Sequence, residues 1–217
     1  MPQGRPPSAA ASMNNRLLRG LDIVGSFVLA IQGASIAAQA GFDIFGVLVV
    51  SLISATGGGI IRDLLIGAYP PEALRGWAIV TSSILGGCLT ILFFHFVEQI
   101  PELPLLLIDA VGLSLLAVAG TEKALETKMT PLAAIMMGAI TGVGGSIVRD
   151  VLLMHVPSIL RVDFIATAAI AGATVLVIVR KLRADPRWAS ALGGLTCCVL
   201  RLIALWQHWR LPTVSLH

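Results

Sequence analysis

Long apolar runs separated by short polar breaks dominate the sequence. Each run holds about 20 mostly apolar residues, the length that a helix needs to cross the hydrocarbon core of a bilayer. Prolines, glycines and charged residues fill the breaks. The runs are residues 21–41, 44–67, 76–97, 104–124, 130–154, 163–182 and 188–208. This pattern predicts an all-α, polytopic membrane protein with seven transmembrane helices. The short breaks leave no room for an extramembrane catalytic domain, so we do not expect an enzyme.

Composition points the same way. Apolar residues make up 56% of the chain, charged residues 12%, and the mean hydropathy is +0.89, whereas soluble domains carry about 25% charged residues. A soluble enzyme, a disordered protein and a secreted disulfide scaffold are therefore disfavoured. Cys88, Cys197 and Cys198 lie inside apolar runs without metal-ligand spacing, so we expect no metal and no cofactor. The basic residues are scattered around the breaks, which argues against a nucleic-acid partner.

The flanks and the basic residues set the expected orientation. Residues 1–15 are rich in Pro, Ser, Ala and Asn and are expected to be disordered. Residues 16–210 should form a single membrane domain, followed by a C-terminal tail at 211–217. Most Lys and Arg residues outside the spans fall on the N-terminal side of the membrane. The positive-inside rule then predicts a multi-pass protein of the inner (plasma) membrane with a cytoplasmic N-terminus.

An internal repeat without gaps relates residues 21–93 to residues 108–180, at an offset of 87. Each copy holds three spans, and an odd number of spans brings the second copy into the membrane from the opposite side. The sequence therefore predicts two inverted repeats at 21–97 and 104–182, with a seventh helix at 188–208 outside them. The polar and glycine identities in register include Asp22 with Asp109, Gly33 with Gly120, Gly57-Gly58 with Gly144-Gly145, Arg62-Asp63 with Arg149-Asp150, and Pro70 with Pro157.

The strongest local signal is a glycine cluster in the middle span of each repeat. The two segments read TGGGIIRDLL at 56–65 and GVGGSIVRDVLL at 142–153. Glycine in a helix costs roughly 1 kcal/mol relative to alanine, so the clusters predict kinks whose freed backbone groups line a cavity. Close helix packing through small residues explains the same pattern. Both interpretations apply to Gly57, Gly58, Gly59, Gly144, Gly145 and Ser146.

An Arg-Asp pair follows each glycine cluster. A charged side chain at mid-membrane costs about 2.5–3.5 kcal/mol on insertion scales, so Arg62, Asp63, Arg149 and Asp150 need partners. Helix neighbours point about 100° apart, which predicts partners across the pseudo-two-fold axis or from the first helix of a repeat, not within each pair. The four residues are expected to line a conduction path or to form a buried network of structural salt bridges.

Two further pairs of charges are candidates for a role in the site. Asp22 and Asp109 lie near the starts of the first and fourth spans, as helix-dipole charges would or as acidic mouths that attract cations would. Glu122 and Lys123 close the fourth span, where they suit the membrane interface, a sensor or a gate. We expect no catalytic residues and no metal ligands.

The paired motifs GGGIIRD (57–63) and GGSIVRD (144–150) each precede a proline, Pro70 or Pro157, by the same spacing. With two three-span repeats and a seventh span, the chain over about 20–210 resembles the bacterial branch of the trimeric intracellular cation (TRIC) channel family. The resemblance implies a homotrimer in membrane lipid with one pore per subunit. That pore would be lined by spans 1, 2, 4 and 5, and spans 2 and 5 would be kinked at their glycine motifs. Such a pore passes monovalent cations, chiefly potassium. Ser146 departs from the third glycine, and animal members have the opposite orientation.

Two functions remain as hypotheses. A channel permeable to potassium or sodium would use Thr56, Thr141 and Ser146 hydroxyls to ease dehydration, Asp63 and Asp150 to hold cations, and the two arginines to fix the kinks. A secondary transporter would bind a small zwitterion such as glycine at broken helix ends, and related bacterial proteins are named as glycine transporters. Ionic currents distinguish the two.

Overall fold

The computed structural model describes residues 9–93, 102–160 and 165–207. The regular elements of this described part are all helical. The longer helices are α1 (Ala9–Gln39), α2 (Ile44–Ile66), α4 (Trp77–Leu92), α6 (Glu102–Glu126), α7 (Pro131–Leu152), α8 (Ile165–Lys181) and α9 (Pro186–Trp206). Two short elements follow the proline positions of the repeat, the helix α3 (Glu72–Arg75) and the 3₁₀ helix η1 (Ser158–Leu160).

Helix length decides which elements can span a bilayer. Five helices within the described residues are long and apolar enough, namely α1 from Leu17, α2, α6 from Leu103, α7 and α9, so the chain is a multi-pass membrane protein. The apolar helix α4 has 16 residues and α8 has 17, which as helices extend about 24–26 Å. Both adjoin segments outside the described residues, 94–101 and 161–164.

The N-terminal prediction needs a correction. Helix α1 begins at Ala9, inside the segment 1–15 that was expected to be disordered. The residues Ala9–Met13 are mostly alanine, the best helix former, and they continue an apolar helix already nucleated by the span. Residues 1–8 and 208–217, which include the tail at 211–217, lie outside the described residues.

Local capping explains where the helices begin and end. The Asp43 carboxylate accepts a hydrogen bond from the Gly46 N–H at 2.7 Å and caps α2, whereas Gly67 ends it with a left-handed φ of 76°. Thr130 caps α7 just before Pro131, and Asp185 caps α9 just before a proline at its first position. The polar breaks of the sequence are therefore true helix boundaries.

Helices α1 and α6 pack in reciprocal pairs. A Cβ added to Gly25 would lie 2.8 Å from Leu116 Cδ2, and a Cβ added to Gly112 would lie 2.6 Å from Leu29 Cδ2. Residue numbers rise along one helix as they fall along the other, so the two helices are antiparallel. Adding 87 to the first residue and subtracting 87 from the second converts one pair into the other. Small residues at these positions let the helices approach closely.

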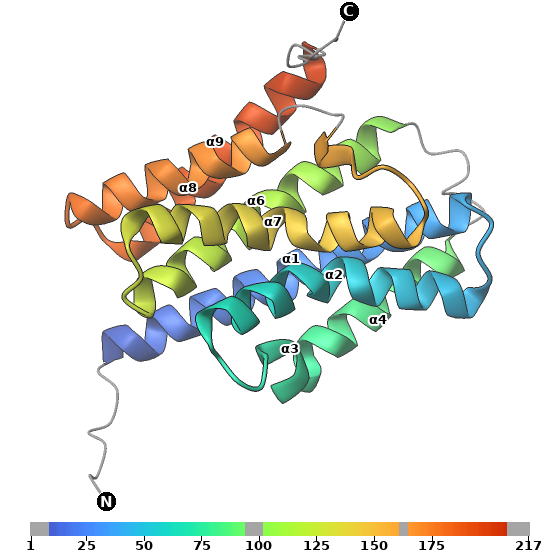
Figure 1. Ribbon diagram of the computed structural model, residues 1–217, viewed down its shortest axis with the longest axis horizontal. Helices are drawn as coiled ribbons and strands as arrows, with labels where there is room; N and C mark the ends of the chain where they lie inside the picture. Colours follow the sequence, from blue (N-terminus) through green and yellow to red (C-terminus); the bar gives the residue numbers. More distant parts are fainter. Residues whose placement is uncertain (1–8, 94–101, 161–164, 208–217) are drawn as a thin grey trace, which may run out of the picture.

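Packing within each half of the chain also repeats. A Cβ on Gly33 would overlap the Ser54 side chain between α1 and α2, and a Cβ on Gly120 would overlap the Thr141 side chain between α6 and α7. Both members of the second pair follow the first by 87 residues. Figure 1 shows α2 and α7 side by side at the centre, running in opposite directions along the long axis.

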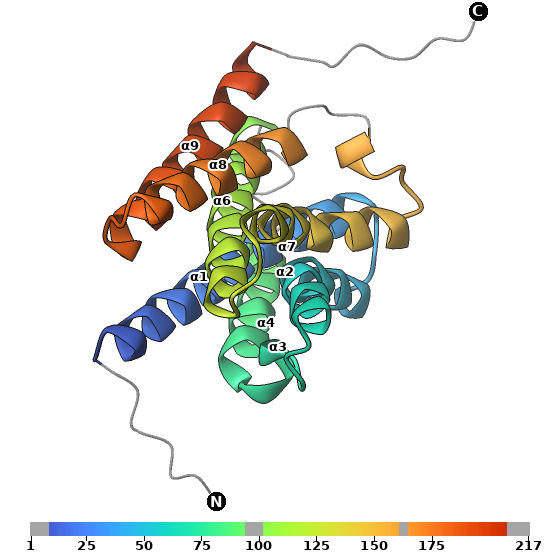
Figure 2. The ribbon, with the colours of Figure 1, turned by 60° about the vertical axis from the view of Figure 1, so that its left-hand side comes forward.

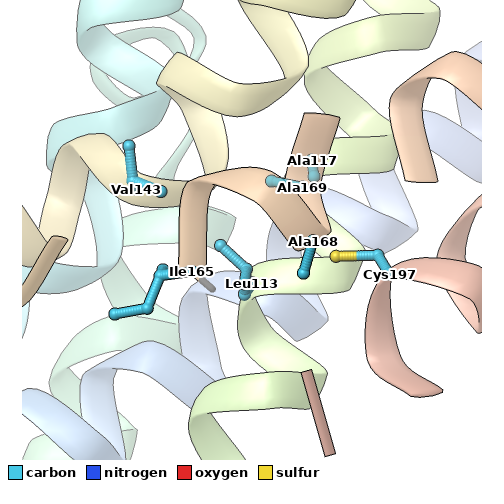
Figure 3. Packing of buried hydrophobic residues seen from close by; sticks show 7 residues of the cluster. All are labelled: Leu113, Ala117, Val143, Ile165, Ala168, Ala169 and Cys197. Atoms are coloured by element: carbon cyan, nitrogen blue, oxygen red, sulfur yellow. The ribbon is translucent and has the colours of Figure 1, made fainter. Parts of the chain in front are cut away.

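Helices α8 and α9 lie on one side of the molecule and α3 and α4 on the other, with α6 and α7 between them (Figure 2). A Cβ on Gly172 would lie 2.6 Å from Cys197 Cβ, so α8 and α9 are in close contact. One buried apolar cluster joins α6, α7, α8 and α9 (Figure 3). Its members are Leu113, Ala117, Val143, Ile165, Ala168, Ala169 and Cys197. Cys197 is fully buried in this cluster and packs there as a small apolar residue.

Candidate functional site

The two glycine clusters lie where α2 and α7 cross. A Cβ on Gly58 would overlap the Thr141 carbonyl oxygen, and a Cβ on Gly145 would overlap the Ser54 carbonyl oxygen. These two contacts are again exchanged by the offset of 87. Gly57 and Gly144 lie in the same crossing, where an added Cβ would come within 3.3 Å of Gly145 Cα and 2.9 Å of Gly58 Cα, respectively. The backbones of α2 and α7 are therefore in direct contact.

Neither α2 nor α7 is interrupted at its glycine cluster, and the kinks expected there stay a prediction. Both are α-helical without interruption through the motifs. Lipid offers no hydrogen bonds, so the backbone keeps its own, and the close crossing offsets the poor helix propensity of glycine. Gly59 faces away from the crossing, with only Arg62 Nη2 near an added Cβ, at 3.8 Å. Ser146 donates to the Val143 carbonyl at 2.8 Å, so it too serves its own helix.

A first charged cluster lies one turn beyond the glycines of α2. Arg62 Nη1 and Nη2 donate to the two Asp22 oxygens at 2.9 and 3.1 Å, and Arg62 Nε donates to Asp63 Oδ1 at 2.8 Å. The Arg62 and Asp63 side chains are 2% and 1% exposed. Lys123 Nζ lies 2.9 Å from Asp63 Oδ1 and 2.8 Å from Glu72 Oε2. Three carboxylates, of which Asp22 and Asp63 are buried, and two cations thus form one network across α1, α2, α3 and α6.

Asp63 also organises the chain that follows its helix. Its Oδ2 accepts a hydrogen bond from the Glu72 backbone N–H at 2.7 Å, at the first residue of α3. In the second half, Asp150 Oδ2 accepts from the Ser158 N–H and from Ser158 Oγ, both at 2.8 Å. The aspartate of each Arg-Asp pair therefore ties the end of its own helix to the short helix after the proline.

A second charged cluster surrounds Arg149 in α7. Arg149 Nε and Nη2 donate to Asp150 Oδ1 at 2.9 and 2.8 Å, and Nη1 donates to Gln32 Oε1 at 3.0 Å. Gln32 Nε2 donates in turn to Asp109 Oδ1 at 2.8 Å. Arg201 Nη2 of α9 donates to Asp109 Oδ2 at 3.2 Å. This network joins α1, α6, α7 and α9.

The structure corrects part of the predicted pairing. Arg62 does pair with Asp22 of the first helix, as expected. The prediction that neighbours would not pair is wrong for both motifs, because each long arginine folds back so that Nε meets the adjacent aspartate. Asp22 and Asp109 are neither helix N-terminal charges nor acidic mouths, since both are buried inside helices and hold arginines.

Glu122 and Lys123 separate although they are neighbours. Lys123 joins the first cluster. Glu122 is fully buried, accepts from Ser190 Oγ at 3.0 Å and lies 3.5 Å from Arg180 Nε. The Glu122 carboxylate therefore packs between α6, α8 and α9, and its position at the membrane interface stays a prediction.

Several residues of the site had not been anticipated. Gln32, Glu72, Ser158 and Arg201 all hydrogen-bond to the charged clusters. Gln32 and Arg201 are polar residues inside apolar runs, a signal that the sequence does contain. Glu72 and Ser158 begin the short helices after the prolines, and only the fold brings them back to Asp63 and Asp150.

Two polar cavities lie at the charged clusters. The first vestibule, of about 460 Å³, is lined by residues that include Asp63, Ala68, Glu72 and Lys123. The second vestibule, of about 470 Å³, is lined by Ile36, Arg149, Asp150, Met154, His155, Val156 and Ser158. Since α2 and α7 are antiparallel and each vestibule lies at the C-terminal end of one of them, the vestibules lie on opposite sides of the glycine crossing. No group of three metal-ligating side chains occurs among the described residues.

Comparison with known proteins gives consistent relatives. The family model described as Glycine transporter matches two segments, residues 19–95 and 106–181. The UPF0126 inner membrane protein YadS of Escherichia coli (strain K12) is 38% identical over 201 residues, which cover 92% of this chain and 97% of the relative. A UPF0126 membrane protein of Deinococcus radiodurans is 37% identical over 199 residues, covering 90% of this chain and 91% of the relative.

Solved structures agree in fold as well as in sequence. A structure described in terms of conductance through TRIC cation channels superposes with a TM-score of 0.85 at 34% identity, covering 92% of this chain and 98% of that one. The TRIC trimeric intracellular cation channel orthologue from Rhodobacter sphaeroides superposes with a TM-score of 0.82 at 34% identity, covering 88% and 98%. The chain therefore belongs to the family whose model is described as Glycine transporter, and its sequence and fold place it with the TRIC cation channels of bacteria.

Proposed function

We propose that the chain forms a potassium-permeable channel for monovalent cations, with one pore in each subunit of a homotrimer in the lipid of the inner membrane. The observation that carries this proposal is the pair of charged vestibules at opposite ends of the α2–α7 crossing. The similarity to structures described as TRIC cation channels supports both the ion class and the trimer.

The architecture that we propose is seven spans, two inverted repeats (21–97 and 104–182) and a seventh helix at 188–208, within one membrane domain at 16–210. The double match of the family model supports the duplication. The reciprocal contacts Gly25–Leu116 with Gly112–Leu29 support the inversion, because two antiparallel copies related by a two-fold axis exchange their contacts. Charge distribution supports a cytoplasmic N-terminus, which places the first vestibule on the cytoplasmic side.

The proposed path runs from the first vestibule through the crossing to the second. Asp63 and Asp150 supply negative charge at the two ends, in surroundings of low dielectric constant where one charge acts strongly. The crossing is tightly packed here, so conduction requires α2 and α7 to bend or separate at Gly57–Gly59 and Gly144–Ser146. The glycines allow this because they leave no side chain to repack.

Lys123 is the proposed gate of the first vestibule. Its ammonium lies between Asp63 and Glu72 at hydrogen-bond distance from both, where a permeant cation would otherwise bind. Its side chain is 18% exposed, so it can swing toward water without crossing the protein. A tethered cation in this place excludes mobile cations until it moves.

A glycine transporter is the second candidate, favoured by the description of the family model. Arg149 and Asp150 carry the charges that a zwitterion needs, a cation for its carboxylate and an anion for its ammonium group. Both side chains already hold each other, so a substrate would have to break that ion pair.

Recording from the purified protein in planar bilayers separates the two candidates. A channel gives unitary current steps in KCl that reverse near the potassium equilibrium potential in asymmetric salt. Asp63→Asn should move the reversal potential toward zero, whereas Asp43→Asn, at the exposed cap of α2, should leave it unchanged. Glycine-stimulated counterflow in liposomes without unitary currents would refute the channel and support the carrier.

A further inference from the structure

The two charged clusters contain repeated residues but pair them differently. In the first cluster, Asp22 binds Arg62 directly through both oxygens, at 2.9 and 3.1 Å. In the second cluster, the equivalent residues Asp109 and Arg149 are bridged by the side-chain amide of Gln32, at 2.8 and 3.0 Å. The repeat alone would predict the same direct pair in both halves. Two features depart from it: Gln32, whose equivalent in the second copy is Ala119, and a charged residue outside the repeat.

Arg201 is the residue outside the repeat that reaches this cluster. It belongs to α9, is 3% exposed, and donates from Nη2 to Asp109 Oδ2 at 3.2 Å. Among the described residues its Nε has no hydrogen-bond partner, and Asp109 is the carboxylate that it contacts. A buried guanidinium left without a carboxylate is strongly unfavourable, which fixes Asp109 toward α9.

The consequence falls on Arg149. Within the part of the chain that the structure describes, Arg62 is shared by two carboxylates, Asp22 and Asp63, whereas Arg149 has one carboxylate, Asp150, and one neutral amide. Arg149 also lines the second vestibule of about 470 Å³. The position equivalent to Lys123 is Ile36 in that vestibule, so Arg149 is the cation that a permeant ion meets there.

We propose that Arg201 is a positioning residue that holds Asp109 away from Arg149 and thereby keeps the second vestibule more positive than direct pairing would. This inference rests on the proposed channel function. Without Arg201, Asp109 is free to turn toward Arg149 as Asp22 turns toward Arg62 in the first cluster, with Gln32, whose equivalent there is Ala119, moving aside. Cations would then enter more readily from the second vestibule.

Rectification measures this effect without depending on the amount of folded protein. Patches of giant bacterial spheroplasts hold all copies in one orientation, so the ratio of inward to outward single-channel current in symmetrical KCl can be compared between variants. Arg201→Met should raise the current that enters from the second vestibule about twofold relative to the opposite current, the effect of one unit charge across roughly 8 Å of water. Arg201→Lys should keep the wild-type ratio, because an ammonium still holds Asp109.

A double variant distinguishes positioning from a purely structural role. In Arg201→Met with Asp109→Asn no carboxylate is left to turn toward Arg149, so the ratio should return to the wild-type value. If Arg201→Met does not yield folded protein, Gln32→Glu places a carboxylate on Arg149 while Arg201 still holds Asp109, and it should shift the ratio in the same direction. A conducting wild type whose ratio is unchanged in Arg201→Met, or in Gln32→Glu, would overturn the inference, whereas a wild type without currents would overturn the proposed function.

Discussion

Alanine at the glycine crossing offers a test with an internal control. A methyl group on Gly58 would overlap the backbone carbonyl oxygen of Thr141 in α7, whereas a methyl group on Gly59, the next residue, would meet only Arg62 Nη2 at 3.8 Å. A backbone oxygen inside a helix cannot rotate away as a side chain can. Gly58→Ala must therefore push α2 and α7 apart by roughly 1 Å to restore an ordinary contact distance.

Both variants gain helix propensity from alanine, but only Gly58→Ala also overpacks the contact between α2 and α7. Alanine in place of glycine stabilises a helix by about 0.5–1 kcal/mol, so Gly59→Ala should be neutral or stabilising. Overpacking costs about 1–3 kcal/mol, which outweighs this gain at Gly58. Since 1 kcal/mol shifts the Tm of a 150–250-residue domain by about 2–4 °C, Gly58→Ala should melt several degrees below Gly59→Ala.

Thermal unfolding of the detergent-solubilised protein, followed by size-exclusion chromatography with fluorescence detection, measures this difference. Gly145→Ala should behave like Gly58→Ala, because its methyl group would overlap the Ser54 carbonyl oxygen from the opposite side. Equal melting temperatures for Gly58→Ala and Gly59→Ala would show that the two helices do not touch at this point, and the proposed closed crossing would be wrong.

Two further predictions concern the first charged cluster. Asp22→Asn leaves Arg62 with one of its two carboxylates and should lower the free energy of unfolding by about 3 kcal/mol, seen as a Tm lower by roughly 6–12 °C. Asp43→Asn should not change the Tm, since asparagine caps a helix as well as aspartate does. An equal Tm for both variants would contradict the buried ion pair. Lys123→Met removes the ammonium between Asp63 and Glu72 and should raise the single-channel potassium conductance or open probability, whereas unchanged or smaller values for both would exclude Lys123 as a gate.

The sequence predicted the features that depend on one element or on the repeat. Apolar runs located the helices, and the breaks coincide with the caps at Asp43, Thr130 and Asp185. The offset of 87 read from the sequence also relates contacts in the structure, since Gly58 meets Thr141 where Gly145 meets Ser54. Local propensity and duplication act at short range or by symmetry, and both are visible in a single sequence.

The features that were missed depend on where side chains end. Backbone angles alone predict no contact between Arg62 and Asp63, but the arginine side chain is long enough to fold back onto its neighbour. For the glycine clusters the sequence left kinking and close packing open, and the crossing shows close packing at Gly58 and Gly145. Arg201 lies outside the repeat, so symmetry could not connect it with Asp109.

Thiol accessibility from the two sides tests the central claim most directly. Ala68 in the first vestibule and His155 in the second are equivalent positions of the repeat. Ala68→Cys and His155→Cys should each lose current when a charged, membrane-impermeant thiol reagent is added, the first only from the cytoplasmic side and the second only from the opposite side, while the wild type with its native cysteines is unaffected. Modification of both variants from the same side, or modification without any change in current, would contradict two vestibules at opposite ends of one cation path.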